Sequence, residues 1–265
     1  MNVCLFGDAR SPHIRRLSQG LAGRDVAVHV VCHKPVAIPG VTVERFAVPP
    51  ASFSNAHRWR RRVSRYLAGS LRDFDVVHVH FLHDWGFEAE HMGLGCFVAT
   101  PWGSEIVHPP LERPPSSELI AKRIQMLHQA PCVTVVGPTF ARMVEAFAGL
   151  PAGRVQVVPW GVDLDHFMPD RANGDHNRRG ACVGFFKGFR EVYGPRTLVE
   201  AVPDVLAHYE DTVFEFVGAG AMLDACRDLA DRLGVQGSIR WSPPRPMARL
   251  PELLSTWDLT VMPSV

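Results

Sequence analysis

Short runs of apolar residues alternate along the chain with longer segments of mixed apolar and polar character. The first run, Val3-Cys4-Leu5-Phe6, has the length of a buried strand and ends at Gly7. Ser11 and Pro12 begin a predicted helix at 11–22, because a serine cap followed by proline favours the first helical turn. The same alternation predicts further strands at 26–31, 41–48, 76–79, 97–99, 133–136 and 155–158, and helices at 57–71, 116–129 and 139–148.

A polar stretch at 166–180 interrupts this alternation and is predicted to be a linker. Beyond it the pattern resumes, with strands predicted at 181–186, 213–217, 238–241 and 259–262 and helices at 196–208, 222–233 and 247–255. Continuous apolar strands separated by helices indicate parallel sheets covered on both faces. We therefore predict an α/β protein with two doubly wound, Rossmann-like domains at 1–165 and 181–265. The second has about four strands where such sheets usually have five or six, so we expect it to be incomplete.

The composition excludes several classes of protein. The 265 residues are 46% apolar and 21% charged, with a net charge of +1, so no domain-wide basic surface points to nucleic acid. The six cysteines form no CxxC pair, which favours buried thiols in a reducing compartment. Polar residues interrupt the apolar start early, and no apolar run has the length of a membrane helix. We expect a cytoplasmic protein.

Ligands of open α/β sheets bind at the carboxyl ends of the strands, where helix N-termini attract anions, so a diphosphate ligand is expected. The first strand-to-helix turn, Gly7-Asp-Ala-Arg-Ser-Pro-His13, lacks the glycine pattern of a dinucleotide site. Gly218-Ala-Gly220 in the second half supplies only part of that pattern. These features alone leave open a nucleotide-dependent oxidoreductase and a nucleotide-dependent transferase.

Several segments, in order along the chain, resemble the large retaining glycosyltransferase family numbered four, which has the GT-B fold. They are the helix at 11–24, the strand Asp75-Val-Val-His-Val-His80, the loop Thr100-Pro-Trp-Gly-Ser-Glu105, the segment Val155-Gln-Val-Val-Pro-Trp-Gly-Val-Asp-Leu-Asp-His-Phe-Met-Pro169, Val217-Gly-Ala-Gly220 and Trp257-Asp-Leu-Thr-Val-Met-Pro-Ser264. The resemblance implies transfer of a sugar from a nucleoside diphosphate sugar to a hydroxyl acceptor, with retained anomeric configuration. It implies no cofactor and no metal ion.

The resemblance also assigns site residues by their positions in these segments. The first domain would bind the acceptor and the second the donor. The expected residues are His80 and Glu105 in catalysis, Gly7, His13, Trp102 and Gly103 on the acceptor side, Lys187 and Arg190 at the donor phosphate, and Gly218, Gly220, Trp241 and Arg245 at the nucleotide.

The chain departs from the family pattern at four positions. Trp102 stands where many relatives have a catalytic His, and Glu105 replaces Asp. Trp160 replaces the Asn of the segment that contains it, and Tyr193 stands where a phosphate-binding Lys is usual. Lys187 and Arg190 are the cations that remain near the start of the second domain.

A group of imidazole and carboxylate side chains near the end of the strand at 76–79 suggests a metal site as an alternative. It consists of His78, His80, His83, Asp84 and His91. No trio among them has the helical spacing of a metal-binding motif. We interpret this segment as a strand end that faces the substrate.

Five arginines surround an apolar stripe in the predicted helix at 57–71. They are Arg58, Arg60, Arg61, Arg62 and Arg65, and the stripe contains Trp59, Val63 and Tyr66. Two interpretations remain open: a solvated face of a helix that packs on the sheet, or attachment to an anionic membrane surface.

The family's Glu-rich segment, which contacts the donor sugar and ribose, would follow Val265 and is absent from these 265 residues. We therefore expect this chain to be inactive in sugar transfer by itself. A non-catalytic scaffold of the same fold is the alternative function that this leaves open.

Overall fold

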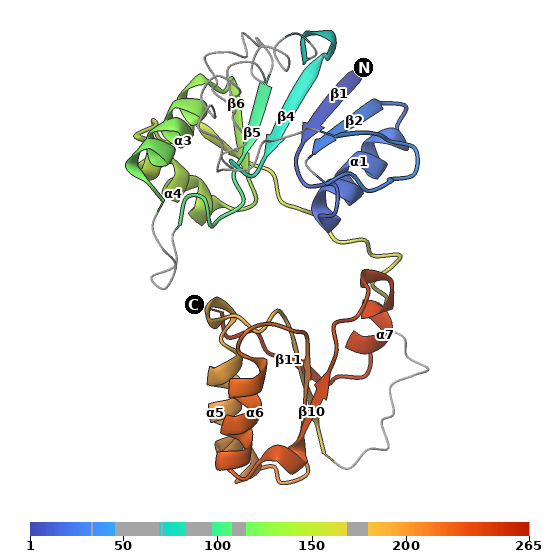
Figure 1. Ribbon diagram of the computed structural model, residues 1–265, viewed down its shortest axis with the longest axis vertical. Coiled ribbons are helices and arrows are strands. Elements are labelled where there is room, and N and C mark those ends of the chain that lie inside the picture. Colours follow the sequence, from blue (N-terminus) through green and yellow to red (C-terminus); the bar gives the residue numbers. More distant parts are fainter. Residues whose placement is uncertain are drawn as a thin grey trace, which may run out of the picture. The chain divides into compact units, whose positions relative to one another are not determined.

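The computed structural model describes residues 1–32, 34–45, 69, 71–82, 97–107, 115–168 and 180–264. The described residues up to Trp160 form one compact unit, and those from Gly161 onwards form a second (Figure 1). The predicted arginine-rich helix at 57–71 lies almost wholly outside the described residues, as does most of the predicted linker at 166–180.

The first unit is built on a parallel sheet of seven strands in the order β3-β2-β1-β4-β5-β6-β7. The strands are β1 (Asn2–Phe6), β2 (Ala27–Cys32), β3 (Thr42–Arg45), β4 (Val76–His80), β5 (Phe97–Thr100), β6 (Cys132–Val135) and β7 (Val155–Val157), and a short 3₁₀ turn, Leu71–Asp73, precedes β4. Every pairing within this sheet is parallel, so the carboxyl ends of its strands lie along one edge.

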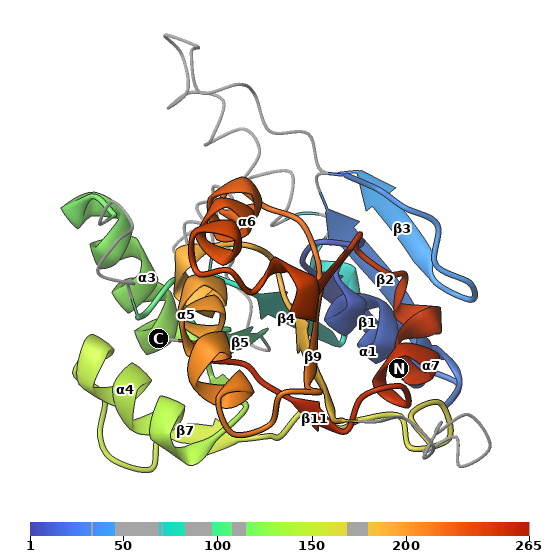
Figure 2. The same ribbon diagram turned by 90° about the horizontal axis from the view of Figure 1, so that it is seen from below.

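Helices cover both faces of this sheet, with α1 (Pro12–Ala22) on one side and α3 (Ser117–Gln129) and α4 (Pro138–Ala148) on the other (Figures 1 and 2). The alternation of side chains along β1 explains the two layers. Val3 and Leu5 join the core under α1, whereas Cys4 and Phe6 join the core under α3 and α4. The helix α1 begins as predicted, with the Ser11 side chain accepting a hydrogen bond from the backbone N–H of His13.

The second unit has a four-stranded parallel sheet in the order β10-β9-β8-β11. Its elements are β8 (Cys182–Phe186), β9 (Val213–Val217), β10 (Ile239–Ser242), β11 (Leu259–Thr260), α5 (Pro195–Leu206), α6 (Leu223–Arg232) and α7 (Leu250–Leu254), with 3₁₀ turns at Glu191–Tyr193, Gln236–Ser238 and Met247–Arg249. The helices α5 and α6 lie on one side of the sheet and α7 on the other (Figures 1 and 2).

Two predicted elements of the second unit differ in extent from the structure. The predicted helix at 247–255 is divided into a 3₁₀ turn and α7. Pro251 explains the division, because it has no N–H to donate to the carbonyl group one turn earlier. The predicted strand at 259–262 is paired only at Leu259 and Thr260, both with β8.

Packing on the α7 side of the second sheet depends on the absence of a side chain at Gly184. The indole ring of Trp257 lies against Gly184 so closely that a Cβ atom there would be 1.9 Å from ring carbons. The indole Nε1 donates a hydrogen bond to Glu215 Oε2 (2.9 Å), and Ser242 Oγ donates to Glu215 Oε1 (2.9 Å). Gly184 on β8 therefore leaves room for the Trp257 ring, which follows α7 in the chain and is hydrogen-bonded to Glu215 on β9.

We predict that Gly184→Ala destabilises the second unit, because the added methyl group would displace the Trp257 ring. Overpacking of this kind costs about 1–3 kcal/mol of unfolding free energy. Denaturant unfolding measures the loss, with Gly237→Ala as a matched control because no atom lies within 4 Å of its Cβ position. Equal stability of the two variants would contradict the prediction.

Candidate functional site

The predicted acceptor-side residues of the first unit follow the carboxyl ends of β1 and β5, the two parallel strands that flank β4. Gly7 comes directly after β1, and a Cβ atom there would lie 2.8 Å from Ile14 Cδ1 and 3.4 Å from His80 Cβ. The absence of a side chain at Gly7 thus allows α1 and the end of β4 to approach each other. Gly103, with φ of 150°, lies in the loop that follows β5.

Two histidines lie together at the end of β4. The ring centroids of His78 and His80 are 3.9 Å apart, and His78 Nε2 lies 2.7 Å from Thr100 Oγ1, which in turn lies 2.5 Å from Thr134 Oγ1. His80 is only 4% exposed, and neither of its ring nitrogens has a hydrogen-bond partner among the described residues.

Burial keeps both imidazoles neutral. It lowers the pKa of His78 from 6.5 to about 4. The pKa of His80 is lowered well below 6.5, first by burial and then by the proximity of His78 and His13. At neutral pH, each ring therefore offers one N–H donor and one nitrogen acceptor.

The carboxylate of Glu105 faces the backbone of its own loop. Glu105 is 1% exposed, and its side chain accepts hydrogen bonds from the N–H groups of Trp102 (2.6 Å), Gly103 (2.9 Å) and Leu82 (3.4 Å). The buried guanidinium of Arg123 donates to the backbone carbonyls of Leu82 (3.1 Å) and Glu105 (2.7 Å). The sequence alone does not predict that Glu105 binds the backbone of this loop. The catalytic role of Glu105 remains a prediction.

Three aromatic rings meet beside this loop. The centroids of His13 and Trp160 are 4.1 Å apart, those of His13 and Trp102 5.5 Å, and those of Trp102 and Trp160 5.3 Å. The indole Nε1 of Trp102 is buried without a hydrogen-bond partner among the described residues. Trp160 was noted in the sequence only as a departure from the family pattern, and the structure adds it to His13 and Trp102. We call these three residues the aromatic cluster.

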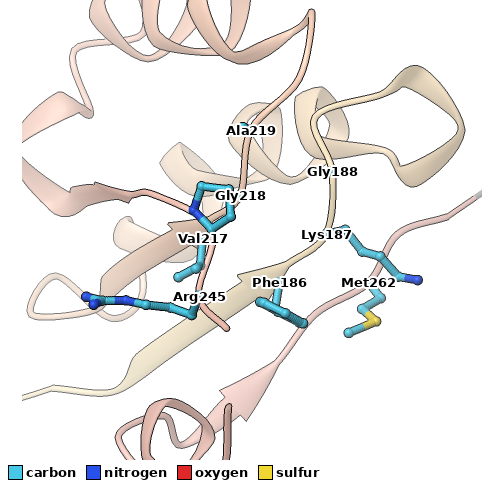
Figure 3. A pocket seen from close by; sticks show the side chains of 9 residues that line it. Phe186, Lys187, Gly188, Val217, Gly218, Ala219, Arg245 and Met262 are labelled. Atoms are coloured by element: carbon cyan, nitrogen blue, oxygen red, sulfur yellow. The ribbon is translucent and has the colours of Figure 1, made fainter. Parts of the chain in front are cut away.

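The second unit has a pocket of about 460 Å³ at the carboxyl ends of its strands (Figure 3). Its lining comprises Phe186, Lys187, Gly188, Val217, Gly218, Ala219, Pro244, Arg245 and Met262. Three of the six residues expected at the donor, Lys187, Gly218 and Arg245, are thus brought together.

The other three expected donor residues lie outside this lining. Trp241 is partly buried and packs against the core, with its ring centroid 4.9 Å from that of Phe216. Gly220 acts through close approach, because a Cβ atom there would be 2.5 Å from the carbonyl oxygen of Phe189. Arg190 lies with its guanidinium carbon 5.9 Å from the centre of the Tyr193 ring.

Glycine also shapes the pocket itself. A Cβ atom on Gly218, where φ is 158°, would lie 2.2 Å from the carbonyl oxygen of Lys187. The loops after β8 and β9 can therefore touch only because this position has no side chain.

Cations border the pocket at two places. The Lys187 ammonium lies 4.9 Å from the centre of the Tyr193 ring, a distance at which the ring face attracts a cation. The side chains of Lys187 and Arg245 extend to opposite sides (Figure 3). Tyr193, which replaces the usual lysine, thus holds Lys187 by its ring rather than adding a charge of its own.

Among the described residues, no group of three or more His, Cys, Asp or Glu side chains could hold a metal ion. His83, Asp84 and His91 of the alternative metal site lie outside the described residues. The part of the chain that the structure describes contains no helix long and apolar enough to cross a membrane.

Two family models match the chain in succession. Residues 11–166 match the model described as Glycosyltransferase Family 4, and residues 169–265 match the model described as Glycosyl transferases group 1. Similar proteins include two D-inositol 3-phosphate glycosyltransferases. That of Corynebacterium urealyticum is 27% identical over 42% of this chain and 30% of its own length, and that of Geodermatophilus obscurus is 26% identical over 97% and 66%. The chain therefore spans less than two thirds of either relative.

Solved structures show the same fold. HepE of Anabaena in complex with UDP has a TM-score of 0.77 at 16% identity, covering 100% of this chain and 74% of its own. WaaG, a glycosyltransferase involved in lipopolysaccharide biosynthesis, has a TM-score of 0.71 at 15% identity, covering 99% and 75%. The predicted fold class, two Rossmann-like domains of the GT-B type, is confirmed.

We predict that acidification destabilises the first unit through His78 and His80. The unfolded state takes up protons near pH 6.5, whereas the folded state holds His78 neutral down to about pH 4 and His80 neutral well below 6.5. Stability is therefore full above 6.5 and falls as pH decreases below it, by at most about 1.4 kcal/mol per pH unit for each histidine.

Denaturant unfolding measured across this pH range tests the effect. Replacing His80 with Asn should reduce the slope of stability against pH, while replacing the exposed His208 with Gln should leave the slope unchanged. Equal slopes in the wild type and His80→Asn would contradict the assignment.

Proposed function

The chain belongs to Glycosyltransferase Family 4, and from that membership we propose that it serves in transferring a sugar from a nucleoside diphosphate sugar to a hydroxyl acceptor, with retained anomeric configuration. The observation that carries the proposal is the pocket at the carboxyl ends of β8 and β9, where a glycine loop and two cations surround a space of about 460 Å³. Such an edge is where open α/β sheets bind nucleotides.

The pocket combines the two kinds of contact that a nucleoside diphosphate requires. Phe186, Pro244 and Met262 offer apolar surface to the base, while Lys187 and Arg245 offer positive charge to the phosphates. Departure of the diphosphate leaves negative charge on the leaving oxygens, and fixed cations stabilise that charge in the transition state. In this proposal the second predicted domain, 181–265, binds the donor, and the first predicted domain, 1–165, binds the acceptor. The reaction needs no metal ion and no cofactor.

In the first unit, Glu105 fixes the loop after β5, and His80 lies beside it as a neutral imidazole. We assign acceptor binding to this edge of the sheet, with the catalytic roles of His80 and Glu105 as part of the proposal. Three of the proteins named above are glycosyltransferases by name: two are D-inositol 3-phosphate glycosyltransferases, and WaaG is involved in lipopolysaccharide biosynthesis. They support a place in glycan, polysaccharide or glycolipid synthesis.

We further propose that the protein works in the cytoplasm at an anionic membrane surface, bound through Arg58, Arg60, Arg61, Arg62 and Arg65. The support is the sequence of that segment, which combines five arginines with an apolar stripe. Such segments bind anionic lipid with about 1 kcal/mol for each basic residue near the surface.

We predict that the protein sediments with phosphatidylserine-containing vesicles and not with phosphatidylcholine vesicles, and that added salt weakens the binding by screening. Replacing Arg61 and Arg62 with Gln should weaken binding about tenfold or more, since each charge contributes about 1 kcal/mol. Replacing the exposed Arg227 and Arg249 of the second unit is the matched control. Equal sedimentation with both vesicle types would show that the arginines form only a solvated face.

We predict that the chain binds UDP, GDP or ADP and that Lys187→Ala weakens this binding about tenfold or more. A hydrogen bond to a charged group contributes roughly 1.5–3 kcal/mol, which corresponds to that loss. Isothermal titration calorimetry with these nucleotides and with NAD(P) measures it, and Lys122→Ala, a lysine paired with Glu118 on α3, is the control.

The same titrations separate the alternatives. Binding of NAD(P) alone would favour an oxidoreductase, and binding of no nucleotide would favour a scaffold. Unchanged affinity in a folded Lys187→Ala variant would remove Lys187 from the site.

A further inference from the structure

The aromatic cluster presents ring surface at the carboxyl edge of the first sheet. His13 is exposed, and Trp160 is 39% exposed although it is one of the largest apolar side chains. The Trp102 ring contacts both rings edge to face, at interplanar angles of 79° and 84°. The three rings therefore pack against one another, while His13 and Trp160 remain accessible to solvent.

Polar atoms with unused hydrogen-bonding capacity lie next to these rings. Among the described residues, nothing pairs with Trp102 Nε1 or with either ring nitrogen of His80, and all three atoms are buried. The His80 and Trp102 rings are 6.0 Å apart. Buried polar groups are nearly always paired, so three unpaired nitrogens in one place indicate a missing partner. Together they offer donors and an acceptor, which a hydroxyl group or an ordered water can satisfy.

We propose that the aromatic cluster is the acceptor platform, and that the acceptor it takes is a sugar or cyclitol ring. The apolar C–H face of the ring would stack on the exposed part of the Trp160 ring, which lies against His13 (ring centroids 4.1 Å apart), and its hydroxyls, directly or through ordered water, would pair with Trp102 and His80. This inference rests on the proposed function, because it gives the acceptor's chemical class at the edge assigned to it.

Two other ligand classes fit less well. A phosphate or carboxylate group needs cations, and two cations close to His13 in sequence are already engaged: Arg10 pairs with Asp8 (2.7 Å) and Arg15 donates to the backbone carbonyl of Ala37 (3.2 Å). A quaternary ammonium group would use the ring faces but would leave the three nitrogens unpaired. A polyhydroxylated ring uses both the faces and the nitrogens.

Saturation-transfer difference NMR tests the proposal with methyl β-D-glucopyranoside, methyl α-D-mannopyranoside and myo-inositol, each with and without saturating UDP. We expect at least one of them to bind with saturation concentrated on the protons of one ring face. Trp160→Ala should weaken that binding about tenfold, or 1.4 kcal/mol, while Trp160→Phe should retain part of it. Tyr209→Ala, which removes an exposed aromatic side chain of the second unit, should have no effect.

Nucleotide binding, measured separately by calorimetry, distinguishes failure of this inference from failure of the proposed function. Nucleotide binding without saccharide binding would overturn the platform alone. Saccharide binding that is equal in wild type and Trp160→Ala would also overturn it, as would preferential binding of tetramethylammonium. Saccharide binding that depends on Trp160, without any nucleotide binding, would support the platform and contradict the donor site.

Discussion

The parallel pairing of the strands is the constraint on which both candidate sites depend. Since all pairings in each sheet run parallel, the loops that leave the strands at their carboxyl ends must collect along one edge. In the first unit that edge gathers His80 and the loop around Trp102, which are distant from His13 in sequence. In the second it gathers Lys187 and Gly218, which line one pocket.

The loops at this edge are stabilised by contacts within each unit, and these contacts differ between the two units. In the first unit, the buried carboxylate of Glu105 accepts three backbone hydrogen bonds, and Arg123 binds two backbone carbonyls nearby. In the second, two glycines allow backbone to lie directly on backbone, at Gly218 and Gly220. The loop of the first unit depends on backbone N–H groups that bind the Glu105 carboxylate. The loops of the second unit depend on the absence of a side chain at Gly218 and Gly220.

The chemistry of the two edges differs accordingly. The edge of the first sheet holds neutral imidazoles and indole rings, which match hydroxyls and the apolar face of a ring. The pocket of the second unit is bordered by Lys187 and Arg245, which match phosphate. The proposed transfer from a diphosphate donor to a hydroxyl acceptor calls for such a division, so two independent observations support the same proposal.

The sequence by itself determined the order of strands and helices, the start of α1 and the family, because apolar periodicity, caps and motifs are local signals. It also indicated Lys187 and Gly218, which follow β8 and β9 directly, and Arg245 in the loop after β10. Only the tertiary structure decided that Glu105 turns inward to its own backbone, that Trp241 packs on Phe216, and that Trp160 joins His13. Those outcomes depend on which atoms from distant segments meet, since burial and hydrogen-bond partners are properties of the assembled sheet and not of any one stretch of chain.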